Sequence, residues 1–144
     1  MKVVIIYAEG LQDESDLTEA VAYAVEEWAA IWAQSGLTLE YRFENSDLSV
    51  TLSDPSYGSA QLEEASTYTD DDEVALLIGE QLAGDLYTYG VSGNIPGALS
   101  VTENSGVVVS WLAAAGTNGV FDESELNIFA ETMAHEVGHY MGLF

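Results

Sequence analysis

The sequence lacks cysteine and has almost no basic side chains. Without cysteine, nothing predicts a disulfide framework, and this composition suits both cytosolic and extracellular proteins. Lys2 and Arg42 are the only lysine and arginine, against 25 acidic residues, so the formal net charge is −23. A surface this negative repels phosphate backbones and anionic lipids. Nucleic acid and membrane surfaces are therefore not expected as partners.

Long apolar runs are missing as well. No segment approaches the roughly 20 apolar residues of a membrane span. Lys2 precedes an apolar run that extends only from Val3 to Tyr7, which suits a buried strand better than an export signal. The 144 residues, 48% of them hydrophobic, can form one substantial core but not two ordinary domains. We expect one domain over residues 1–144.

Strand patterns recur along the whole chain. Continuous apolar runs rich in β-branched residues predict buried strands at 3–8, 74–78 and 107–111. Strict alternation predicts a strand at 37–43 with its odd-numbered side chains on the core. A polar excursion at 44–73 could hold one more strand at 48–52, and Pro96 makes a short apolar piece at 98–101 an edge strand or a surface hairpin.

Two segments have helical spacing. In the first, apolar residues from Leu17 to Trp32 predict a helix that begins with a capping box of Asp16 and Glu19 and ends at Gly36. The alternation of strands and helices predicts an α/β fold, with a twisted, mostly parallel sheet of about five strands and this helix backing it.

The second helix closes the chain. Asp122 and Glu125 form the expected capping box. The apolar stripe that should face the sheet consists of Leu126, Phe129, Met133 and Val137. Ile128 and Tyr140 are expected to be packing residues.

Both histidines of the chain lie in this second helix. Side chains four residues apart lie one turn above each other, so His135 and His139 can converge on one metal ion. Glu136 would lie beside that metal, where a carboxylate can take a proton from a water that zinc has made more acidic. The spacing indicates a zinc site that hydrolyses peptides. The alternative is a helix with two solvated histidines.

The stretch His-Glu-Val-Gly-His-Tyr-Met-Gly, from His135 to Gly142, resembles the active-site helix of the metzincin clan of zinc metallopeptidases. It is most similar to the pappalysin and cytophagalysin branch. The resemblance implies the N-terminal lobe of an extracellular zinc endopeptidase, with His135 and His139 as zinc ligands, Glu136 as general base, and a peptide or protein as substrate. It also implies an antiparallel edge strand that borders the cleft and pairs with extended substrate.

In that clan a third histidine lies three residues after the glycine, and this chain ends one residue earlier, at Phe144. A catalytic zinc usually has three protein ligands, and the sequence offers two. We therefore expect a truncated or cleaved form of a longer enzyme, or a site completed by a missing C-terminal segment or a second chain. The competing hypothesis is a non-catalytic binding or assembly module built on the same kind of lobe, in which a metal acts as a structural clamp.

One acidic run is dense enough to suggest a second metal. Asp70–Glu73 places four carboxylates in a row, and clustered carboxylate oxygens are the ligands that Ca²⁺ prefers. The run lacks the glycine and the spacing of a helix-loop-helix calcium loop. A solvated acidic surface suited to saline conditions explains it equally simply. A calcium-dependent surface protein in which the histidine pair is incidental is a third hypothesis.

Overall fold

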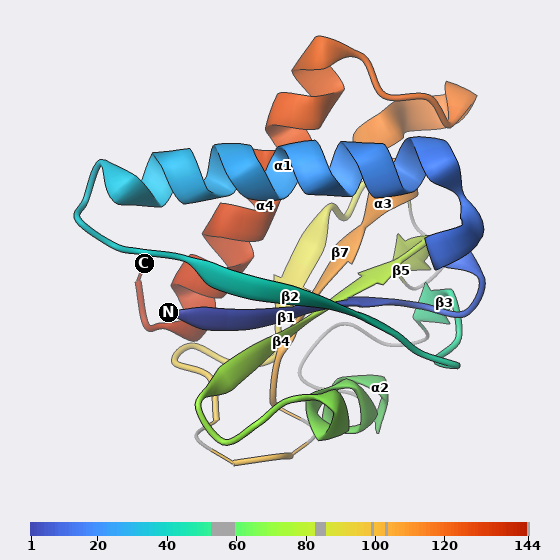
Figure 1. Cartoon of the computed structure of the whole chain (residues 1–144). Coiled ribbons are helices and arrows are strands. Elements are labelled where there is room, and N and C mark those ends of the chain that lie inside the picture. Colours follow the sequence, from blue (N-terminus) through green and yellow to red (C-terminus); the bar gives the residue numbers. More distant parts are fainter. Residues whose placement is uncertain (53–59, 83–85, 99, 103, 144) are drawn as a thin grey trace.

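A five-stranded sheet is the frame of the fold (Figure 1). The computed structural model describes residues 1–52, 60–82, 86–98, 100–102 and 104–143. The sheet has the spatial order β2-β1-β4-β7-β6, and its neighbouring strands are parallel except for β6, which runs antiparallel to β7. Its strands are β1 (Lys2–Tyr7), β2 (Glu40–Asn45), β4 (Glu73–Gly79), β6 (Gly90–Ser92) and β7 (Val107–Ser110). The predicted mostly parallel sheet of five strands is confirmed.

Helices cover both faces of this sheet. The two long helices, α1 (Ser15–Ala33) and α4 (Glu123–Tyr140), pack against each other on one face, and the short helix α2 (Ala60–Ala65) lies on the other (Figure 1). The remaining elements are β3 (Thr51–Leu52), paired with β5 (Gln81–Leu82), α3 (Trp111–Ala115), and the 3₁₀ turns η1 (Leu11–Asp13), η2 (Ser66–Tyr68) and η3 (Gly116–Asn118). No helix in the described part of the chain combines the length and apolar character that a membrane span requires.

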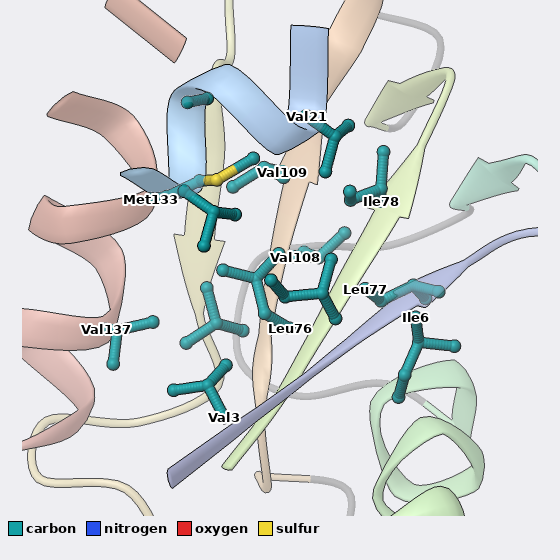
Figure 2. Packing of buried hydrophobic residues seen from close by; sticks show 14 of the residues in the cluster. Val3, Ile6, Val21, Leu76, Leu77, Ile78, Val108, Val109, Met133 and Val137 are labelled. Carbon is teal, nitrogen blue, oxygen red and sulfur yellow. The ribbon is translucent and has the colours of Figure 1, made fainter. Parts of the chain in front are cut away.

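The core lies between the sheet and the two long helices. Val3 to Tyr7 are all buried, because β1 is a central strand covered on both faces. Figure 2 shows Met133 and Val137 of α4 beside Val109 and Leu76 of the sheet, with Ile6 pointing toward the opposite side. The predicted stripe of α4 is confirmed, since Phe129, Met133 and Val137 are fully buried and Leu126 is half-buried.

The ends of α1 confirm one prediction and correct another. Gly36 has a left-handed backbone with φ +76°, and the Leu37 N–H donates to the Trp32 carbonyl at 3.2 Å, so the helix ends as expected. The prediction of a capping box formed by Asp16 and Glu19 is wrong. The helix already begins at Ser15, and its N-cap is Glu14, whose side chain makes no capping hydrogen bond.

Three strand predictions also need correction. β2 lies at 40–45 rather than 37–43, and its odd-numbered Tyr41 and Phe43 are 42% and 43% exposed. β2 is an edge strand, and no helix of the described residues covers its outer part. The edge strand expected at 98–101 lies instead at Gly90–Ser92; residue 99 is outside the described residues. Trp111 opens α3 and does not extend β7, since the Ser110 hydroxyl accepts from the Ala113 N–H and caps a new helix.

Both basic side chains are held in ion pairs by the acidic run 70–73. Lys2 donates to Asp72 at 2.6 Å. Arg42 donates two hydrogen bonds to Glu73, of 2.9 and 2.7 Å. It also donates to Glu44 and to the Tyr68 carbonyl. The Arg42 guanidinium holds the pKa of the Glu73 carboxyl below its usual value. These contacts neutralise two charges, and the other carboxylates repel one another.

We therefore expect salt to stabilise the fold. Raising NaCl from about 0.01 M to about 1 M shortens the Debye length from roughly 30 Å to roughly 3 Å, which screens the repulsion among carboxylates more than the close pairs. The melting temperature, followed by circular dichroism, should rise with salt. A melting temperature that falls with salt would show that the Lys2 and Arg42 pairs outweigh the repulsion.

Candidate functional site

One face of α4 presents the three residues of the sequence motif. The helix begins with the predicted capping box: the Asp122 side chain accepts from the Glu125 N–H at 2.9 Å, and the Glu125 side chain accepts from the Asp122 N–H at 2.8 Å. Burial of Met133 and Val137 fixes the rotation of the helix. His135 is consequently exposed, and Glu136 and His139 are half-buried at the same edge of the sheet.

The two imidazoles lie side by side. Their ring centroids are 4.2 Å apart with an interplanar angle of 76°, which is the juxtaposition that the four-residue spacing predicts. His139 Nδ1 lies 2.9 Å from the Leu143 carbonyl oxygen. A carbonyl can only accept, so Nδ1 is the donor in this hydrogen bond, which leaves Nε2 as the nitrogen available to ligate. Metal-binding histidines commonly use this arrangement, in which a backbone carbonyl sets the tautomer and the other nitrogen ligates.

A tight turn after α4 positions that carbonyl. Gly142 has φ +87°, and the Leu143 N–H donates to the Gly138 carbonyl at 3.0 Å, so the chain reverses toward His139. Tyr140 is a packing residue, as predicted. Its ring lies where a Cβ of Gly97 would be, and its hydroxyl donates to the Ala98 carbonyl at 2.6 Å.

Glu136 lies against strand β6. A Cβ built on Gly90 would approach the Glu136 Cγ to 2.7 Å, so the side chain occupies space that only glycine leaves open. Burial raises the pKa of the Glu136 carboxyl, while His135, His139 and the backbone N–H of Ser92 act in the opposite direction. The carboxyl is therefore close to the imidazoles and to the edge strand at once.

An open groove runs beside these residues, with a volume of about 380 Å³. Its walls are Tyr89, Gly90, Ile128, Glu131, Thr132, His135 and Glu136. Ile128 was predicted to be a packing residue; it is instead 36% exposed and lines the groove. Sequence reasoning also missed Glu131 and Gly90. Helical spacing could have indicated Glu131, which precedes His135 by one turn, whereas nothing local marks Gly90.

The outer edge of β6 turns backbone groups away from β7, and one of them, the Ser92 N–H, already acts on Glu136. The Gly93 N–H donates to the Gly106 carbonyl and the Ser110 N–H donates to the Tyr89 carbonyl. Hydrogen bonding in an antiparallel pair alternates along the strand. Gly90 and Ser92, which lie between Tyr89 and Gly93, therefore turn their N–H and C=O groups away from β7. The edge can accept another extended strand.

The arrangement fits a zinc ion in part. Two imidazoles one helical turn apart are suitable ligands, and both act on the pKa of the neighbouring Glu136 carboxyl. Within the described residues, no group of three or more histidine, cysteine, aspartate or glutamate side chains is placed to hold a metal.

Calcium binding at Asp70–Glu73 stays a prediction. Two of its four carboxylates are engaged by Lys2 and Arg42, and Glu73 also accepts from the Asp70 N–H at 2.9 Å. The run lines a separate cavity of about 250 Å³ together with Tyr140.

Comparison with protein-family models finds no match to the chain, and comparison with curated protein sequences finds none either.

The contact between Gly90 and Glu136 can be tested by a pair of substitutions. Gly90→Ala should displace Glu136 and lower the free energy of unfolding by about 1–3 kcal/mol, because the new methyl group overlaps the Glu136 side chain. Gly138→Ala is the matched control in α4: its methyl would come no closer than 3.9 Å to a neighbouring side chain, so we expect about 0.5–1 kcal/mol of stabilisation. Denaturant melts and a crystal structure of Gly90→Ala measure both effects; an unmoved Glu136 would contradict the first.

Proposed function

We propose that this chain is the N-terminal lobe of a metzincin-like, zinc-dependent endopeptidase. The observation that carries the proposal is the pair of imidazoles, 4.2 Å apart, beside a groove-lining glutamate at an open sheet edge. The spacing of His135, Glu136 and His139 alone predicts a zinc site. The hydrogen bond of His139 to the Leu143 carbonyl adds support, because it leaves Nε2 free to ligate.

Each residue has a definite task in this proposal. His135 and His139 hold the metal through their imidazole nitrogens. Zinc, when bound, supplies a Lewis acid that polarises a carbonyl and makes water more acidic. Glu136 accepts a proton from the attacking water and passes it to the leaving amine as general base and then general acid. Its place against Gly90 keeps the carboxylate at the groove wall.

The edge strand supports a peptide as substrate. The resemblance implies an antiparallel edge strand at the cleft, and β6 is antiparallel, lies at the sheet edge and contributes Gly90 to the groove. Its outward backbone groups at Gly90, and the outward C=O of Ser92, can pair with an extended peptide. An extracellular location belongs to the same proposal and rests on the resemblance alone.

A second candidate function follows from the number of ligands. The described residues bring two imidazoles together, whereas a catalytic zinc takes three protein ligands. A non-catalytic binding or assembly module, in which a metal clamps this lobe to another segment or chain, needs no water activation. The two candidates differ in turnover and not in metal binding.

Metal analysis tests the histidine pair. The purified chain should bind zinc, and His135→Ala and His139→Ala should each weaken binding by roughly 10-fold or more, because each removes a direct ligand. Substitution of Tyr140 by phenylalanine is the control, since the Tyr140 hydroxyl is engaged by the Ala98 carbonyl and not by either histidine. Equal zinc affinity in all four proteins, by competition with a chromogenic chelator, would refute the site.

Hydrolysis distinguishes the two candidates. With a quenched fluorescent peptide library as substrate, turnover should require zinc, stop on adding a chelator, and fall by roughly 10²–10⁴ in Glu136→Gln while zinc binding is retained. Zinc binding without turnover would favour the clamp. Normal turnover in Glu136→Gln would remove Glu136 from its proposed role.

A further inference from the structure

The sheet has a second open edge, formed by β2 on the side opposite to β6. Within the ranges that the structure describes, β2 pairs with β1 and with no other strand. The Glu40 N–H donates to the Met1 carbonyl and the Ser46 N–H donates to the Tyr7 carbonyl, so the even-numbered residues bond inward. By the alternation of a parallel ladder, Tyr41, Phe43 and Asn45 turn their N–H and C=O groups outward. This edge can accept one more strand.

Exposed aromatic side chains lie along that edge. Tyr41 and Phe43 contact each other with ring centroids 5.7 Å apart, and Phe43 stacks on the buried Tyr7 at 6.0 Å. Burial raises the pKa of Tyr7 to about 12, so that ring stays neutral. The three rings form a preordered apolar surface beside unpaired backbone groups, which is the combination that β-strand addition uses. We call Tyr41, Phe43 and the outward backbone of β2 the β2 edge.

The charged side chains of β2 indicate which kind of partner strand would fit this edge. Side chains alternate along a strand, so Glu40 and Glu44 lie on the face opposite to Tyr41 and Phe43. Arg42, between them, is already held by Glu73 and Glu44. An added strand would therefore meet aromatic rings on one face and an excess of carboxylates on the other. A second copy of this chain fits poorly, because two chains of charge −23 repel each other.

We propose that the β2 edge docks an extended segment of a basic partner protein, in which apolar residues alternate with lysine or arginine. The apolar residues pack on Tyr41 and Phe43, and the basic ones face the glutamates on the opposite side. The backbone pairs with Tyr41, Phe43 and Asn45. This surface is separate from the groove beside α4, so the proposal does not depend on metal binding or hydrolysis.

Titration with defined peptides tests the proposal. The probe is a blocked peptide of about ten residues of alternating valine and lysine, and the control alternates valine and glutamate. The lysine peptide should shift the amide resonances of Tyr41, Phe43 and Asn45 and slow their hydrogen exchange, and its affinity should fall with salt. The glutamate peptide should do neither. Shifts confined to Gly90 and Ser92 would place binding in the groove and overturn the proposal.

Matched variants separate the backbone from the side chains. Asn45→Pro removes one outward N–H and no ladder bond, so it should weaken binding roughly fivefold or more, whereas Asn45→Ala should bind normally. Phe43→Ser should weaken binding similarly, and Phe43→Tyr should restore it. Melting curves establish that each variant is folded. Normal affinity in both Asn45→Pro and Phe43→Ser, or a stable dimer of the free chain by sedimentation, would overturn the proposal.

Discussion

Burial of one stripe of α4 against the sheet fixes the positions of His135, Glu136 and His139. Phe129, Met133 and Val137 are fully buried, and truncating side chains of this kind costs about 2–5 kcal/mol each. With this stripe buried, α4 has one stable rotation about its own axis. His135 and His139 then lie one helical turn apart at the edge beside β6, and the helix repeat sets their separation. The packed stripe thereby holds the two histidines in place, although they lie outside the core.

The sequence predicts the features that depend on local periodicity. Continuous apolar runs identified β1, β4 and β7, because strands covered on both faces need apolar residues at every position. The capping box identified the start of α4 for a similar reason, since the signal lies within one turn of the helix. The same locality explains why the histidine pair could be predicted: both rings belong to one element.

Features that depend on neighbours distant in sequence could not be predicted. Alternation showed that β2 has one apolar face, but not whether a helix would cover it, and Tyr41 and Phe43 remain exposed for lack of that cover. The Gly90 contact with Glu136 joins a loop-like segment to a helix, and a lone glycine carries no signal for it. The helices α2 and α3 were missed because one turn of helix is too short to show periodicity.

The negative charge of the protein acts at both edges of the sheet. Lys2 and Arg42 are both paired with the acidic run at the start of β4, so neither contributes a positive charge to the groove, whose lining includes Glu131 and Glu136. A chain of charge −23 attracts divalent cations and basic peptides over distances of about a Debye length. At the groove, the two imidazoles can convert this general attraction into specific coordination. At β2, aromatic rings and unpaired backbone can convert it into strand pairing, so one electrostatic field serves two chemically different surfaces.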